Sequence, residues 1–139
     1  MLIGKPPCDR FTAASRRQNP ETRTAMKASL SELLARIPGS PSPQWPAAEH
    51  FAQAFSHGSM SVGLYAPVGS DRQQPHQRDE LYIIHAGAGE LVIAGVRHAF
   101  AAGDVFFVGS GVEHHFENFA AEFSTWVIFW GPAGGEPQT

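Results

Sequence analysis

From Glu49 onward, the sequence is a succession of short apolar segments separated by turn residues. Within each segment the apolar residues tend to recur at every second position, which is typical of half-buried strands. Two segments lie around Phe51–Phe55 and Met60–Leu64. The others are Asp79–His85, Glu90–Ala94, Val96–Phe100, Val105–Val108, Glu113–Glu117 and Glu122–Trp130. Because no long helix separates them, the strands must pair antiparallel, and closure into a barrel or jelly roll would remove exposed sheet edges.

Composition supports this all-β prediction and excludes several classes of protein. The chain has 139 residues, 14 of them glycine and 11 proline, which favours one turn-rich domain. Its longest apolar run, Trp126–Trp130, is far shorter than the roughly 20 residues of a membrane-spanning helix. Residues 26–139 carry eleven acidic and five basic side chains, so they are a poor partner for nucleic acid. We therefore expect neither a membrane nor a nucleic-acid partner.

The chain divides into three expected regions. Residues 1–25 are polar and basic without apolar periodicity, which predicts a disordered extension. Residues 26–48 begin with the capping box Ser29–Glu32, which predicts a short helix followed by a proline-rich linker. Residues 49–139 form the predicted barrel. The chain has one cysteine and so no internal disulfide framework, which favours a reducing, cytoplasmic location.

The spacing of the histidines separates candidate ligands from structural residues. His76 and Glu80 are four residues apart, so an extended segment would place both on one face, together with Tyr82. In the second half of the chain, His114 shares a face with Phe116 and Asn118, whereas His115 points to the other side. A buried imidazole and a buried carboxylate are costly without a partner, and a divalent metal would satisfy both.

These residues belong to two longer patterns. The chain resembles the cupins, whose motifs are G-x5-H-x-H-x3-4-E-x6-G and G-x5-P-x-G-x2-H-x3-N. The resemblance covers about residues 51–131 and implies a double-stranded β-helix, or jelly-roll barrel. His76-x3-Glu80-x6-Gly87 matches the later part of the first motif. The second motif is matched in spacing by Gly103, Gly109, Gly111, His114 and Asn118, with glycine in place of the proline.

The first motif is incomplete, and this affects the expected metal site. The cupin ligand set is three histidines and one glutamate, but Gln74 stands where the leading histidine would be. The resemblance leaves His76, Glu80 and His114 as ligands, a set comparable in type to the facial triad of non-haem iron enzymes. Gln74 is expected to share their face and could add an amide oxygen. One divalent transition metal is expected, either iron, manganese, nickel or zinc; the alternative is a metal-free barrel in which His76 pairs with Glu80.

Two classes of function remain open at this point. The first is a small metalloenzyme with dioxygenase, isomerase or decarboxylase chemistry on a small organic molecule; the fold hosts all three, and no separate catalytic base stands out. The second is a non-catalytic module that binds or senses a small ligand, with or without a metal. Tyr82, Phe116 and Asn118 are the expected pocket residues. The aromatic strand Glu122–Trp130 favours core or dimer packing, and a homodimer is expected.

Overall fold

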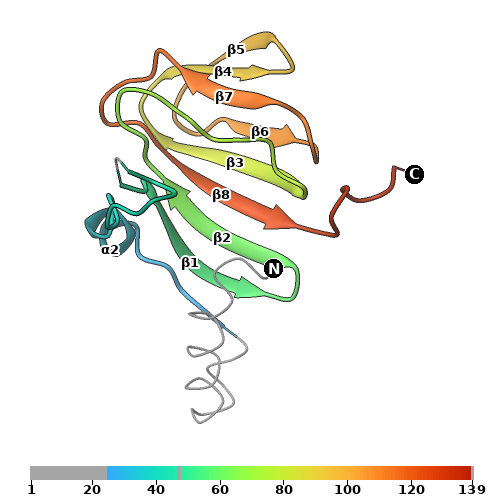
Figure 1. The fold of residues 1–139 in the computed structure, drawn as a ribbon, viewed down its shortest axis with the longest axis horizontal. Helices are drawn as coiled ribbons and strands as arrows, with labels where there is room; N and C mark the ends of the chain where they lie inside the picture. Colours follow the sequence, from blue (N-terminus) through green and yellow to red (C-terminus); the bar gives the residue numbers. More distant parts are fainter. Residues whose placement is uncertain (1–24, 47, 139) are drawn as a thin grey trace.

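The described part of the chain forms two antiparallel β-sheets that enclose an aromatic core, together with one short helix (Figure 1). The computed structural model describes residues 25–46 and 48–138. The predicted N-terminal extension, residues 1–25, thus lies almost wholly outside the described residues. None of the helices within the described ranges has the length and apolar character needed to span a bilayer.

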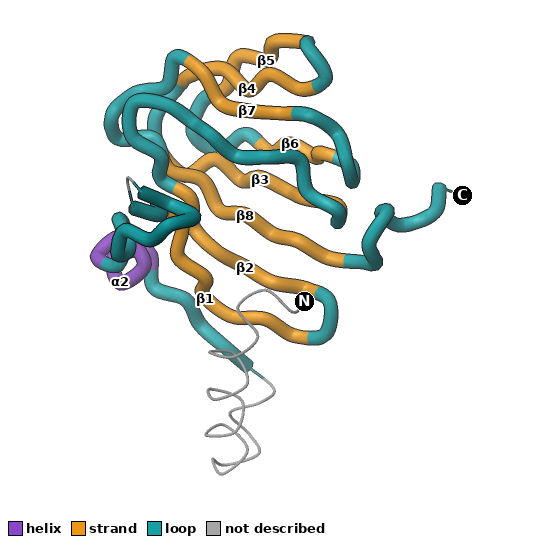
Figure 2. The backbone as a smooth tube through the Cα atoms, viewed as in Figure 1, coloured by secondary structure: helices purple, strands orange, loops and turns teal. Residues whose placement is uncertain are grey.

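The strands of each sheet follow the predicted segments closely. The larger sheet has five strands in the order β1-β2-β8-β3-β6, and the smaller has three in the order β5-β4-β7 (Figures 1 and 2). The strands of the larger sheet are β1 (Phe51–His57), β2 (Met60–Tyr65), β8 (Ser124–Trp130), β3 (Asp79–Ala86) and β6 (Val105–Val108). Those of the smaller sheet are β5 (Val96–Phe100), β4 (Gly89–Ile93) and β7 (His114–Glu117). The all-β jelly-roll prediction is confirmed.

The core lies between the two sheets. It consists of one buried cluster to which both sheets contribute: Tyr82, Ile84, Leu91, Phe100, Val108, Phe116, Phe123 and Val127. The Phe116 ring packs edge-on against Tyr82 at 4.9 Å and against Phe100 at 5.7 Å between ring centroids. Full burial of one such side chain stabilises a fold by about 1.5–3 kcal/mol. This cluster therefore fixes the two sheets against each other and closes the interior behind the candidate site.

Steric constraints explain why the first motif ends in a glycine. Gly87 follows β3 with a φ of +87°, a region that other residues rarely adopt. A Cβ at this position would lie 2.8 Å from the Cα of Phe123. The chain can therefore leave β3 and pass next to the start of β8 only with glycine here.

The predicted helix is α2 (Leu30–Ala35), and it packs outside the barrel (Figure 1). The Ser29 side chain accepts a hydrogen bond from the Glu32 amide, which confirms the predicted N-cap. Leu33 is buried with Ala52 and Leu64 in a small second cluster. Leu34, the next residue of the same helix, is 39% exposed.

The C-terminal segment is attached to the barrel through a buried carboxylate. Asp79 is 7% exposed and accepts hydrogen bonds from the backbone amides of Ser110, at 3.0 Å, and Glu136, at 2.9 Å. Asp79 is the first residue of β3, and Ser110 lies in the turn between β6 and β7. One side chain thus connects the segment after β8 to the turn that precedes His114.

Candidate metal centre

The residues of β3 alternate between the interior and the outer surface. Glu80, Tyr82 and Ile84 are buried, whereas Ile83 and His85 are exposed. This alternation is the one predicted from the sequence, and it directs the Glu80 carboxylate into the barrel. Glu80 is paired with Val108 of β6 and with Phe129 of β8, so its backbone is held on both sides.

Strand β7 shows the same alternation in the opposite sheet. His114 and Phe116 are buried, whereas His115 and Glu117 are only half-buried and form an ion pair on the outer face at 2.6 Å. His114 is paired with Ile93 of β4. The expected division between an inward His114 and an outward His115 is therefore observed.

His76 reaches the same place from a loop. Residues 66–78 connect β2 to β3 without forming a strand. The backbone carbonyl of His76 accepts a hydrogen bond from the Gly111 amide at 2.6 Å. Its imidazole packs edge-on against Phe129, with 4.8 Å between ring centroids. These contacts hold His76 beside the interior, with 32% of its side chain still exposed.

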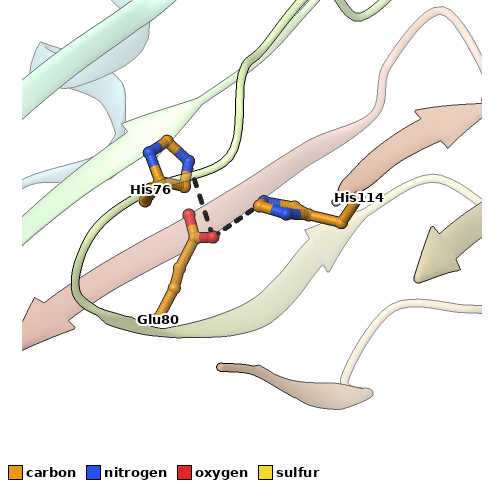
Figure 3. A group of neighbouring side chains, drawn as sticks. All are labelled: His76, Glu80 and His114. Carbon is orange, nitrogen blue, oxygen red and sulfur yellow. Dashed lines mark ion pairs between the residues drawn. The ribbon is translucent and has the colours of Figure 1, made fainter. Parts of the chain in front are cut away.

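The three side chains converge on one carboxylate oxygen (Figure 3). Oε1 of Glu80 lies 3.0 Å from Nε2 of His114 and 3.7 Å from Nε2 of His76. One donor atom from each residue lies within 4.8 Å of the other two. Nitrogen and oxygen ligands bind a transition metal at about 2.0–2.2 Å, so two ligand atoms on the same ion lie at most about 4.4 Å apart. A small inward adjustment would therefore bring all three to binding distance.

The hydrogen bonds of His114 determine which of its nitrogens can bind a cation. Its Nδ1 lies 2.8 Å from the carbonyl oxygen of Val112, which can only accept, so Nδ1 carries a proton. In the neutral ring Nε2 then holds a lone pair, and it faces Glu80 Oε1. That oxygen is buried and has no hydrogen bond from any described residue. Two acceptors this close require either a proton or a metal ion between them.

The electrostatics of the two histidines differ. Burial lowers the pKa of His114, but the nearby Glu80 carboxylate and the hydrogen bond to the Val112 carbonyl together outweigh burial, so the pKa is raised above the usual value. Burial also lowers the pKa of His76, and here the charge of Glu80 does not compensate, so the pKa is lowered. His76 is thus readily neutral, the form that binds metals.

The predicted pocket residues do not gather around the three ligands. Tyr82 and Phe116 are buried members of the core, and only the Tyr82 hydroxyl reaches the site, 3.1 Å from Nε2 of His114. Asn118 is exposed and donates a hydrogen bond to Glu90 on the outer face. It follows the end of β7 with a φ of +52°, so strand alternation no longer applies to it.

Gln74 also departs from its expected place. It is exposed, and the neighbouring Gln73 extends to the site instead. The expectation relied on strand alternation, but β3 begins only at Asp79, so the alternation does not extend back to position 74.

A polar network that the sequence does not reveal lies behind the ligands. Oε1 of Gln73 accepts a hydrogen bond from the Tyr82 hydroxyl at 2.9 Å, and Asp71 in turn binds the Gln73 amide. Tyr65, at the end of β2, donates its hydroxyl to Asp71. Burial raises the pKa of Tyr65, and the Asp71 charge adds to the effect. An aspartate two residues before a glutamine in a loop gives no periodic signal from which this network could be predicted.

A cavity of about 390 Å³ lies away from these residues. It is lined by the end of β3, the start of β8 and the end of α2, including Ile37, His85 and Phe123. None of the three candidate ligands lines it. His85 is exposed at the mouth of this cavity, on the face of β3 opposite Glu80.

Comparison with known proteins agrees with this architecture. The family model of the cupin domain matches residues 62–129. An uncharacterized protein from Streptomyces coelicolor is 33% identical over 84 residues, which cover 59% of this chain and 80% of that protein.

Two solved structures show the same fold. A cupin 2 conserved barrel domain protein from Salinispora arenicola matches 83% of this chain and 88% of its own, with a TM-score of 0.52 and 19% identity. An RmlC-like cupin family protein with a double-stranded β-helix fold, from Methanocaldococcus jannaschii, matches 58% of this chain and 77% of its own, with a TM-score of 0.51 and 14% identity. With the two motifs, the sheet order and these matches together, the chain belongs to the cupin family.

Proposed function

We propose that this cupin binds one divalent transition metal through His76, Glu80 and His114 and acts as a small metalloenzyme on a small organic molecule. The observation that carries the proposal is the buried Oε1 of Glu80, which has no hydrogen bond among the described residues and faces two imidazole nitrogens. Two imidazoles and a carboxylate suit iron, manganese, nickel or zinc. Such an ion would supply Lewis-acid or redox chemistry toward a carbonyl, hydroxyl or carboxylate.

The chain's own residues define how a substrate would approach. Glu80 and His114 are buried, whereas His76 retains 32% side-chain exposure, so access is from the His76 side. Tyr82, Phe100 and Phe116 fill the interior behind the ligands and exclude water from it. The Tyr82 hydroxyl, hydrogen-bonded to Gln73, lies beside His114 and holds its ring from that side. Dioxygenase, isomerase and decarboxylase chemistry are all compatible with this arrangement.

Metal content of the purified protein tests the proposal. We expect about one transition-metal ion per chain by elemental mass spectrometry, or its recovery when iron, manganese, nickel or zinc is added to chelator-treated protein. His115→Ala is the matched control, because its side chain lies on the outer face of the same strand. Stoichiometry near zero that added metal does not restore would overturn the proposal.

The second candidate is a metal-free cupin that binds or senses a small ligand. The raised pKa of His114 favours it, because a proton on Nε2 would satisfy Glu80 as an ion pair. Under this alternative the protein contains no metal at any pH. The change of its thermal stability with pH would then include the protonation of His114 but no effect of added metal.

The single cysteine leads us to infer a reducing, cytoplasmic location. We also infer that two copies of the chain associate through the outer face of β3 and β6. Val105 and Phe107 are 56% and 58% exposed there, and Ile83 is 36% exposed. Phe107→Glu should convert a dimer to a monomer in sedimentation or size-exclusion measurements. A wild-type protein that is monomeric at all concentrations would contradict the dimer.

A further inference from the structure

Gln73 has the polar contacts that the sequence led us to expect of Gln74. Its Oε1 lies 2.9 Å from the Tyr82 hydroxyl and 3.3 Å from Nε2 of His76. Tyr82 in turn lies 3.1 Å from Nε2 of His114. The amide oxygen therefore contacts His76 directly and is linked to His114 through the Tyr82 hydroxyl, whereas Gln74 is exposed.

The orientation of this amide is fixed by Asp71. Nε2 of Gln73 donates to Oδ2 of Asp71 at 2.6 Å, and since a carboxylate only accepts, the oxygen must face the site. Asp71 also accepts from the Gln73 backbone amide, from the Tyr65 hydroxyl and from the Phe116 amide of β7. Four donors, two of them from other elements, leave Asp71 little freedom to move. The loop thus presents the Gln73 oxygen in a preset direction.

The atoms around this oxygen leave room for a cation. The one hydrogen bond that Gln73 Oε1 accepts, from the Tyr82 hydroxyl, leaves the oxygen a second lone pair. Nε2 of His76 lies 3.3 Å away, and Nε2 of His114 lies on the other side of the Tyr82 hydroxyl, next to Glu80 Oε1. A cation held by His76, Glu80 and His114 would therefore lie close to the Gln73 oxygen.

We propose that the carbonyl oxygen of Gln73, held by Asp71, completes the metal donor set with His76, Glu80 and His114. This inference rests on the proposed function and adds to it a donor outside the cupin motif. The set then has two nitrogens and two oxygens. Since carbonyl and carboxylate oxygens suit manganese better than they suit softer metals, the loss of Gln73 should weaken Mn²⁺ binding more than Zn²⁺ binding.

Metal affinity of paired variants tests the assignment. Mn²⁺ and Zn²⁺ would be titrated, against a competing chelator, into wild type, Gln73→Met and Gln74→Met. Methionine keeps the length of the side chain and removes its oxygen, and position 74 controls for the substitution itself. We expect Gln73→Met to lose about tenfold or more in Mn²⁺ affinity, and Gln74→Met to match wild type. Electron paramagnetic resonance of bound Mn²⁺ should also change in Gln73→Met alone, which a purely structural role would not require.

Each outcome has a separate meaning. Wild type that binds metal while both variants retain its affinity and spectrum would overturn the role of Gln73 and leave the three-residue site intact. Wild type that binds no metal would overturn both the role of Gln73 and the proposed function. Melting temperatures of the metal-free proteins verify that Gln73→Met is folded. If it is not, Asp71→Asn tests the same point, because losing the bond that orients the amide should weaken Mn²⁺ binding in the same direction.

Discussion

Each face of strand β7 carries a histidine that pairs with a glutamate, and the two pairs differ in their surroundings more than in their geometry. On the inner face, His114 lies 3.0 Å from Glu80 with 1–2% of either side chain exposed. On the outer face, His115 lies 2.6 Å from Glu117 with 38% and 34% exposed. The shorter contact is the one at the surface. Distance alone would therefore select the wrong pair as the functional site.

The partners of the two carboxylates explain the difference. The Glu117 carboxylate contacts both His115 and Arg97. The Arg97 guanidinium lies 2.6 Å from that carboxylate and also contacts Glu90. The hydrogen bonds from His115 and Arg97 hold the pKa of Glu117 below its usual value. Glu80 Oε1 has no hydrogen bond among the described residues. The outer carboxylate is thus paired with two basic side chains, whereas the inner carboxylate oxygen needs a proton or a metal ion between it and His114.

The largest expected contrast is in metal binding by the two histidine variants. His114→Ala should lose more than about 100-fold in affinity, because even residues behind the ligands typically contribute 10–100-fold. His115→Ala should bind as wild type does. Isothermal titration of each variant with the same metal measures both. Equal losses would show that His114 is not a ligand.

A second contrast lies in stability. Glu80→Gln replaces a buried oxygen that faces two imidazoles, and we expect it to cost roughly 1–3 kcal/mol and to remove any stabilisation by added metal. Glu117→Gln lies at the surface and should change the melting temperature little. Urea unfolding with and without metal compares the two. A Glu80→Gln protein that is still stabilised by metal would contradict the role of Glu80.

The pH dependence of stability distinguishes a metal-free ion pair between His114 and Glu80 from a metal site at the same residues. The folded-state pKa of His114 is raised, so in metal-free protein the ion pair contributes stability below the usual histidine pKa, near 6.5, and loses it as pH rises through the raised value. Protons compete with a metal, so stabilisation by metal should instead grow from about pH 6 to pH 8. Melting curves of chelated and metal-loaded protein over this range show both trends. A metal effect that is constant with pH would argue against binding through His114.

Salt concentration should have the smallest effect on stability, and only through the charges on the outer face. The difference in stability between wild type and Glu117→Gln should shrink as ionic strength rises, because exposed charges are screened. The difference between wild type and Glu80→Gln should remain, since that pair is buried. Melting temperatures at low and high sodium chloride test this. A salt-sensitive Glu80→Gln difference would mean that water reaches the inner pair.

The sequence predicted the faces of the strands better than the loops between them. The inward placement of Glu80 and His114 followed from alternation, because β3 and β7 are regular where these residues lie. The N-cap at Ser29 followed from local chemistry. Gln73 could not be found in this way, because the direction of its side chain depends on Asp71 and thus on contacts distant in sequence. Asn118 matched a motif, but its positive φ turns it out of the strand.

The buried carboxylate of Asp79 makes the end of the chain relevant to the interior. Its two backbone donors come from Ser110 and from Glu136, which lies beyond the last strand. Asp79 is the neighbour of Glu80 in β3, and Ser110 lies shortly before His114. A shortened form of the chain that stops before residue 136 would leave an acceptor without its partner next to Glu80. Recombinant versions designed for metal work should therefore retain this segment and carry any affinity tag beyond it.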